Sequence, residues 1–255
     1  MAKTASPSKR LYDWLPLASN LTEWNISLSP DQKNQIENYL NLVACHDLES
    51  GLTADISPQN LLLRHAADAL ACLPFLKRIK ETYFQEVLSV ADLGSGAGFI
   101  GVVIKIAFPE IDMTLIEPLK KRFDFLNLTL IALGIKGIHL IRKPTGEQNS
   151  VFFDIVLERA VAPFHKAVKI ANPLLKPNGF FIAYQSQDLT VAPTASDAPP
   201  SILPLVVKEK FNYRLPSDDK NRYLILCRKA TAQVRHSGES RNPEDRRSGP
   251  RLSSG

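Results

Sequence analysis

A glycine-rich segment near the middle of the chain places the strongest constraint on its fold. The segment reads Val90-Ala-Asp-Leu-Gly-Ser-Gly-Ala-Gly-Phe-Ile-Gly101 and continues an apolar run that starts at Val87. Glycines at 94, 96 and 98 permit backbone angles that other residues rarely adopt, and they bring bare N–H groups close to a ligand. The pattern therefore predicts a strand, a tight turn and a helix, with a ligand held at the turn.

A second apolar run, Met113-Thr-Leu-Ile-Glu117, ends in an acid about 20 residues after the turn. In α/β units that bind nucleosides, an acid at this place holds ribose hydroxyls. The segment Gly96-Ala-Gly98-Phe-Ile-Gly101 also satisfies the G-x-G-x-x-G pattern of dinucleotide sites, which alone is a weak signal. An NAD-dependent oxidoreductase is therefore one alternative, although the sequence shows no convincing pair of Tyr and Lys for hydride transfer.

Asp92 argues against a dinucleotide, because it ends the first strand where the turn would cradle a pyrophosphate. Like charges in a partly dry site repel strongly, so a cofactor without phosphates fits better. The D-x-G-x-G-x-G arrangement resembles the cofactor loop of S-adenosylmethionine-dependent methyltransferases, whose ligand carries an amino acid and a sulfonium. Asp92, Gly94, Gly96 and Glu117 are accordingly predicted to bind S-adenosyl-L-methionine, and Asp92 would complement a cation.

Strand and helix signals alternate along the rest of the chain. Residues 1–28 show little periodicity and are expected to be a loosely ordered N-terminus. Residues 29–85 are expected to form a helical segment on the substrate side, with a capping box at Ser29-Pro-Asp-Gln32 and a second helix that starts at Ser57-Pro58 and stops at Pro74. Further strands are predicted over 112–117, 138–141, 152–157 and 180–184, with helices over 119–133 and 164–175 and a closing antiparallel pair over 203–211 and 222–227.

This order predicts an α/β protein with a Rossmann-like, doubly wound sheet that ends in an antiparallel hairpin. The Rossmann-like domain is expected to span residues 86–229. Residues 230–255 contain few apolar side chains and are predicted to be a disordered basic tail. From Lys229 onward six basic residues face three acidic ones, so +3 of the net charge of +5 lies in the last 27 residues. Contact of the tail with RNA and a functionally neutral extension both stay open.

Composition predicts a soluble cytoplasmic protein. The richest apolar run, 99–108, is shorter than the roughly 20 residues of a membrane span and contains Lys105. The N-terminal residues lack an apolar signal core. Cysteines 45, 72 and 227 form no C-x-x-C pattern, so no disulfide framework and no metal site are expected.

Several motifs together resemble one family. The residues are Gln32-Lys-Asn-Gln35, Leu63-Arg-His65 with Asp68, the turn from Asp92 to Gly101, Thr114-Leu-Ile-Glu117 with Lys121-Arg122, and Arg159-Ala160 with Arg222-Tyr-Leu224. In order and spacing they are similar to the bacterial small-subunit ribosomal RNA methyltransferase G family, also called the glucose-inhibited division protein B family. The similarity covers roughly residues 25–229. It implies a class I methyltransferase that transfers a methyl group from S-adenosylmethionine to N7 of a guanine in 16S ribosomal RNA, with the small ribosomal subunit as partner and no membrane contact. A monomer is expected.

The resemblance also implies roles for individual residues. Gly94 and Phe99 would line the cofactor, Glu117 would hold its ribose, Gly146 and Glu147 would lie at the adenine, and Arg159 would close the site. Arg64, His65 and Lys121 are candidates for substrate contact. No catalytic acid or base is expected, because guanine N7 carries a lone pair and no proton.

The chain also departs from the family pattern. Where the family usually has Lys-Gly after the fifth strand, this chain has Gln185-Ser186. A non-catalytic module that binds RNA or the ribosome is therefore a third class that the sequence leaves open.

Overall fold

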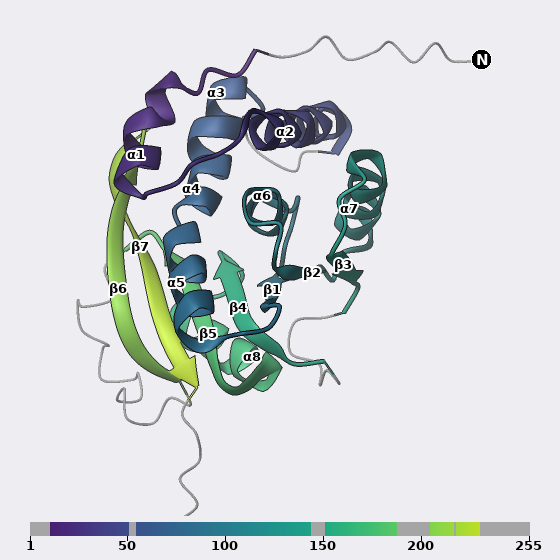
Figure 1. Cartoon of the computed structure of the whole chain (residues 1–255). Coiled ribbons are helices and arrows are strands. Elements are labelled where there is room, and N and C mark those ends of the chain that lie inside the picture. The colour runs from purple at the N-terminus through teal and green to yellow at the C-terminus, as the bar shows by residue number, and fades with distance from the viewer. Residues whose placement is uncertain (1–10, 51–54, 144–150, 188–204, 217, 230–255) are drawn as a thin grey trace, which may run out of the picture.

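A seven-stranded sheet forms the centre of the molecule in the computed structural model, which describes residues 11–50, 55–143, 151–187, 205–216 and 218–229 (Figure 1). The strand order is β3-β2-β1-β4-β5-β7-β6. Strands β1 to β5 pair in parallel, whereas β7 is antiparallel to both β5 and β6. The predicted parallel sheet with a terminal antiparallel hairpin is thereby confirmed. The strands are β1 (Ser89–Leu93), β2 (Asp112–Ile116), β3 (Ile138–Ile141), β4 (Phe153–Arg159), β5 (Leu175–Gln185), β6 (Leu205–Leu215) and β7 (Asp218–Lys229).

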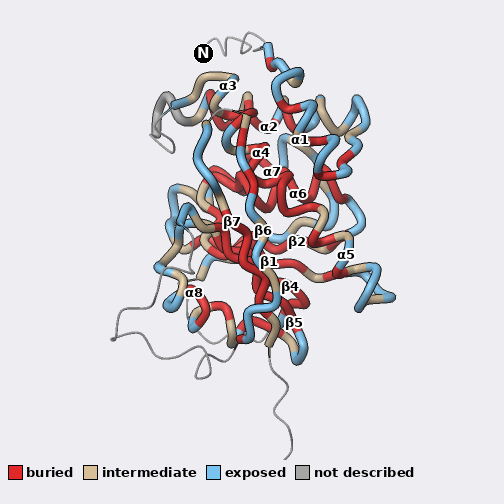
Figure 2. Tube along the Cα trace, turned by 90° about the vertical axis from the view of Figure 1, so that its left-hand side faces the viewer, coloured by how far each residue is buried: buried red, intermediate tan, exposed pale blue. Residues whose placement is uncertain are grey.

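Helices cover both faces of the sheet, and each face has its own core. The larger core joins the N-terminal helices and α6 to one face, while α8 packs on the other face. Buried residues accordingly concentrate along the sheet and the inner sides of the helices (Figure 2). The helices are η1 (Leu15–Leu17), α1 (Ala18–Glu23), α2 (Pro30–Ser50), α3 (Pro58–Asn60), η2 (Leu61–Ala66), α4 (Ala67–Leu70), α5 (Leu73–Tyr83), α6 (Phe99–Ala107), α7 (Lys120–Leu133), α8 (Phe164–Ala171) and η3 (Asn172–Leu174).

The predicted capping box starts α2. The Ser29 hydroxyl accepts a hydrogen bond from the Gln32 backbone N–H at 3.1 Å, and the Gln32 side-chain carbonyl accepts one from the Ser29 N–H at 2.9 Å. The Gln32 amide also donates to the carbonyls of Ile106 and Ala107 at the end of α6. One side chain therefore caps α2 and fixes it to the helix that follows the glycine turn.

The structure differs from the sequence prediction in the N-terminal segment. Residues 15–23, expected to be loosely ordered, form η1 and α1, because Leu17 and Trp24 are buried. The ring of Trp24 packs edge-on against Tyr213 of β6, with ring centroids 6.1 Å apart. A strand far away in the sequence thus orders this segment, and local periodicity does not reveal such a contact.

Two predicted breaks take a different form in the structure. Pro74 lies in the first turn of α5, where its missing N–H and fixed φ suit a helix start, so it opens a helix after the break instead of marking a stop before the sheet. Residues 176–179, predicted as a break, lie within β5, but the pairing of β5 with β4 shifts register between Leu175 and Phe180, and Asn178 has a φ of +63°. The strand is therefore interrupted at the predicted place.

The winding of the sheet reverses between β1 and β4, whose carboxyl ends lie side by side. In open α/β sheets this reversal leaves a crevice outside the carboxyl ends of the strands, where ligands bind. Among the described residues, no helix is long and apolar enough to span a membrane. The predicted basic tail, together with Gly146 and Glu147, lies outside the described residues.

Candidate active site

A cleft of about 460 Å³ opens at the carboxyl ends of β1, β2 and β4. Its walls come from the glycine turn, from the loop after β2, from the end of β4 and from η2. The lining residues are His65, Asp92, Gly94, Ser95, Gly96, Ala97, Phe99, Ile100, Glu117, Pro118, Leu119, Arg122, Arg159, Ala160 and Val161. This first cleft contains six of the eight residues predicted to bind the cofactor.

The turn needs its glycines for two reasons. Gly94 and Gly96 have φ of +68° and +62°, in the left-handed region that side chains rarely adopt. A Cβ on Gly94 would lie 2.4 Å from Cγ2 of Val161, whereas a Cβ on Gly96 would meet nothing closer than the Gly94 carbonyl at 4.0 Å. Gly94 thus lets two chain segments approach, while Gly96 leaves space open beside the turn.

Asp92 ties the turn to the helix that follows it. Its buried carboxylate accepts a hydrogen bond from the Gly101 N–H at 2.9 Å. A Cβ on Gly101 would lie 2.2 Å from Leu115, so this glycine allows α6 to pack closely on the sheet. Burial raises the pKa of Asp92 to about 6, and the Gly101 N–H opposes that rise. The carboxylate lines the first cleft, and its observed bond is to a backbone amide.

Glu117, just after β2, connects the end of that strand to the glycine turn. Its Oε2 accepts a hydrogen bond from the Gly96 N–H at 2.8 Å, and its Oε1 accepts one from the Leu119 N–H at 2.9 Å. The residue is only 1% exposed. Because an ionised carboxylate has about four acceptor positions, both oxygens keep capacity for hydroxyl groups of a ligand. Two backbone donors hold the acid at the wall of the cleft.

A second cleft of about 400 Å³ adjoins the first one. Both clefts are lined by His65, Arg159 and Ala160, which therefore lie between them. The remaining lining residues of the second cleft are Arg64, Asp68, Ala162, Tyr184, Gln185, Ser186, Tyr213 and Arg222. Arg64 and His65 belong to η2, a π-helical turn, and such turns are frequent at functional sites.

The His65 imidazole stacks on the Phe99 ring, with ring centroids 4.2 Å apart and an angle of 13° between the planes. Burial, together with the positive charges of Arg159 and Arg64, lowers the pKa of His65 to about 4. The imidazole is therefore neutral at pH 7. The guanidinium of Arg159 lies over the same Phe99 ring, 5.8 Å from its centroid. Phe99 thus supports both side chains that separate the clefts.

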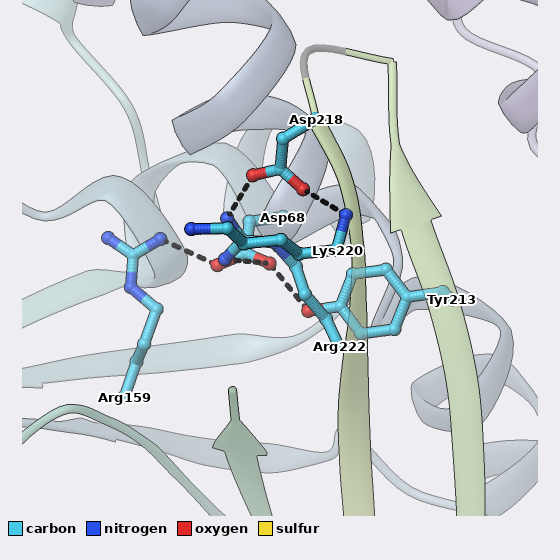
Figure 3. Close-up of polar contacts among 6 residues, drawn as sticks. All are labelled: Asp68, Arg159, Tyr213, Asp218, Lys220 and Arg222. Carbon is cyan, nitrogen blue, oxygen red and sulfur yellow. Dashed lines mark hydrogen bonds and ion pairs between the residues drawn. The ribbon is translucent and has the colours of Figure 1, made fainter. Parts of the chain in front are cut away.

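A buried ionic cluster forms one wall of the second cleft (Figure 3). Asp68 is 3% exposed, and its Oδ2 accepts a hydrogen bond from Arg159 Nη1 at 3.0 Å. Its Oδ1 accepts one from the Tyr213 hydroxyl and lies 3.8 Å from Arg222 Nη1. Arg222 also donates to Asp218 at 2.9 Å. Side chains from α4, β4, β6 and β7 meet in this cluster.

The structure brings most of the predicted site residues together. Asp92, Gly94, Gly96, Phe99, Glu117 and Arg159 line the first cleft, and Arg64 and His65 line the second. Lys121 differs, since it is exposed on α7 and lines neither cleft. No role was predicted for four lining residues: Arg122, Asp68, Tyr213 and Arg222. All of them except Tyr213 belong to the motifs that carry the family resemblance. The spacing of Arg64, His65 and Asp68 over one helical turn was a usable signal, because residues three and four apart share a helix face.

Two comparisons of the sequence agree on one family. The GidB family, described as rRNA small subunit methyltransferase G, matches residues 32–203. A protein named ribosomal RNA small subunit methyltransferase G from Streptococcus agalactiae serotype V is 34% identical over 217 residues, which cover 83% of this chain and 90% of the relative. Its namesake from Streptococcus pneumoniae serotype 19F is 31% identical over 214 residues, covering 82% and 88%. Among solved structures, TrmN from Thermus thermophilus is 15% identical with a TM-score of 0.47, over 66% of this chain and 53% of that chain.

Proposed function

The chain belongs to the rRNA small subunit methyltransferase G family, and on this premise we propose that it transfers a methyl group from S-adenosylmethionine to N7 of a guanine in 16S ribosomal RNA. One observation carries the proposal. Buried Glu117 binds the glycine turn in the wall of a cleft at the carboxyl ends of the strands, and a second cleft adjoins the first one through Arg159. A cofactor and an acceptor can therefore lie next to each other.

The residues of the first cleft fit S-adenosylmethionine. Glu117 offers its remaining acceptor capacity to the ribose hydroxyls, and the open space at Gly96 admits a ligand close to the backbone. Asp92 adds a carboxylate, which suits a ligand with an ammonium and a sulfonium better than one with phosphates. Arg122 extends the lining on the side of α7. We also propose adenine contacts for Gly146 and Glu147, as the family resemblance implies.

Positioning is the main contribution of the protein to the reaction. When bound, S-adenosylmethionine supplies an electrophilic methyl carbon, and its sulfur retains the electron pair of the broken carbon–sulfur bond. Because guanine N7 carries a lone pair and no proton, no side chain of this chain has to act as a general base. The clefts instead hold acceptor and methyl donor at reacting distance, which alone can lower the barrier by several kcal/mol. Arg64 and Arg159 are placed to orient the RNA, since arginine matches phosphate and guanine O6.

The proposed substrate also implies where the protein acts and on which partner. A protein that modifies 16S ribosomal RNA acts on the small ribosomal subunit or its precursors in the cytoplasm. We expect it to act as a monomer.

The test is methyl transfer with purified components. The protein is incubated with methyl-labelled S-adenosylmethionine and small ribosomal subunits from cells that lack it, and 16S RNA is digested to nucleosides. We expect label in 7-methylguanosine. S-Adenosylhomocysteine, but not NADH, should raise the melting temperature, because only the former lacks phosphates. RNA binding without any transfer of label would instead indicate a non-catalytic module.

A further inference from the structure

We propose, on the basis of the function proposed above, that the second cleft receives the acceptor guanine, extruded from the RNA, and that Asp68 is the residue that positions its arginine wall. The location supports this assignment first. The second cleft shares His65, Arg159 and Ala160 with the first cleft, so a base inside it lies beside the methyl donor. Enzymes that act on a base commonly take it out of its stack into a pocket, because the reacting atom is otherwise out of reach.

The charge of the second cleft suits a nucleotide. Three arginines line it, namely Arg64, Arg159 and Arg222, against the single carboxylate of Asp68. The size of about 400 Å³ falls within the range of about 300–1,000 Å³ that is usual for ligand pockets. Asp218 pairs with Arg222 from outside the lining, so Arg64 is left as the surplus guanidinium group, which suits a base that carries its phosphate.

One unsatisfied group points to a ligand. Among the residues that the structure describes, the buried Nε of Arg222 has no hydrogen-bond partner, although the two Nη atoms of this residue lie against Asp68 and Asp218. A buried donor without a partner costs free energy, and a ligand with an acceptor recovers that cost once a small shift of the Arg222 side chain turns its Nε toward the cleft. Guanine O6 and a phosphate oxygen are both such acceptors.

Asp68 holds this wall in place without reaching the first cleft. Its two oxygens bind Arg159 and Tyr213 and face Arg222, so one carboxylate orients side chains from three strands (Figure 3). Without its negative charge, Arg159 and Arg222 would repel each other and lose their shared partner. Because Arg159 lines both clefts, Asp68 also fixes the geometry between acceptor and donor. Asp68 is thus a positioning residue.

A blocking substitution tests the cleft. Ser186 is exposed and lines the second cleft but not the first, so Ser186→Trp should fill the acceptor site and spare the cofactor site. We expect methyl transfer to small subunits to fall about 100-fold, as displaced reactants do. Affinity for S-adenosylhomocysteine, measured by calorimetry, should stay within about twofold of wild type, a change well below 1 kcal/mol.

The matched control places the same side chain in another hollow. Glu110 is exposed and lines a third cleft at the amino ends of the strands, together with Asp112 and Gly137. Glu110→Trp should transfer methyl groups at the wild-type rate. Transfer by Ser186→Trp at the rate of this control would overturn the assignment of the second cleft.

Two further variants test the wall. Asp68→Asn keeps the shape but removes the charge, and kcat should fall about 10-fold to 100-fold while S-adenosylhomocysteine affinity is retained. Since Asp68 is buried, this variant can lose stability, and Arg222→Gln provides an independent probe at a half-buried position. A lower melting temperature with unchanged kcat in both variants would reduce Asp68 to a purely structural residue.

A binding probe separates this inference from the proposed function. Guanosine 5′-monophosphate is added to the protein with S-adenosylhomocysteine, and contact is detected by saturation-transfer NMR. Wild type and Glu110→Trp should show contact, and Ser186→Trp should not. If the nucleotide behaves in this way but wild type methylates no ribosomal RNA, the proposed function fails and the pocket stands. If nucleotide contact survives in Ser186→Trp, the pocket assignment is overturned, whatever the enzyme does.

Discussion

The two clefts are built in different ways although they share a wall. The first is assembled mainly from backbone and from residues close in the sequence, with Glu117 binding Gly96 only 21 positions away. The second is assembled from side chains, with Asp68 binding Tyr213 across 145 positions. The difference suits their proposed ligands, because an invariant cofactor needs fixed backbone groups, whereas an RNA base needs charged side chains. Because the clefts are built differently, we expect single substitutions to affect cofactor binding and RNA binding separately.

Gly96→Val should produce the largest effect and destroy only the first cleft. The new side chain would enter the open space beside the turn and strain a residue at φ +62°. We expect S-adenosylhomocysteine affinity to fall by more than about 100-fold, which is about 3 kcal/mol. Gly134→Val is the control, because it has φ +61° and nothing within 4 Å but lies at the end of α7. Unchanged cofactor affinity in folded Gly96→Val would remove the turn from the site.

Removing Arg64 and Arg159 together should have the second-largest effect. The double variant Arg64→Ala/Arg159→Ala is expected to lower kcat/KM for small subunits by about 100-fold, because both guanidinium groups line the second cleft. Arg64→Ala alone should weaken RNA binding and reduce its salt dependence by about one unit of slope, with little effect on the cofactor. Filter-binding at several salt concentrations measures this slope. Wild-type transfer by the double variant would place the RNA on another face.

Glu117→Ala should weaken the cofactor by about 1–3 kcal/mol, as when buried hydroxyls lose a charged acceptor. Calorimetry with S-adenosylhomocysteine checks the value. The carboxylate also binds the N–H groups of Gly96 and Leu119, so part of the loss would come from a displaced turn. Glu117→Gln keeps one oxygen acceptor and should lose less. Equal affinity in wild type and Glu117→Ala would mean that the ribose is held elsewhere.

Protonation of His65, which lies between the clefts, should lower the free energy of unfolding at acid pH. Its folded pKa of about 4 lies below the usual value of 6.5, so between these values the unfolded chain binds more protons, and stability falls as pH falls. Asp92, with a pKa raised to about 6, acts in the opposite direction over much of this window. The wild type is therefore compared with His65→Phe, which keeps Asp92 and an aromatic ring against Phe99 but cannot be protonated at position 65. Urea unfolding should show wild type losing up to about 3 kcal/mol relative to this variant between pH 7 and 4. A constant difference would contradict a buried neutral imidazole.

Deleting residues 231–255 should have the smallest effect. A segment of this composition buries little surface, so the melting temperature should stay nearly unchanged. A drop of several degrees would show that the tail docks on the folded part. A loss of RNA affinity at constant stability would instead extend the substrate-binding region beyond the second cleft.

The first cleft was largely predictable because its signals are local. A glycine turn after a strand, an acid after the next strand and a capping box each depend on neighbours within a few residues. The second cleft was not, since nothing near Tyr213 or Arg222 in the sequence announces that Asp68 will meet them. The same reason explains the N-terminal segment, where Asn20 donates a hydrogen bond to the carbonyl of Arg214 across 194 positions. Pro74 was predicted to end a helix, but proline is also favoured in the first turn of a helix, and here it begins α5.

The reversed direction of β7 has a consequence for how such a protein can change over evolutionary time. Because β7 runs against its neighbour β5, its early residue Arg222 reaches the same edge of the sheet as the late residue Tyr184. The hairpin that it forms with β6 lies at the margin of the sheet, away from β1 and β2. Mutations there would alter the proposed acceptor site while the strands that carry the glycine turn remain untouched. On this proposal, a protein of this fold can thus change the nucleotide that it recognises through the hairpin and keep the same methyl donor.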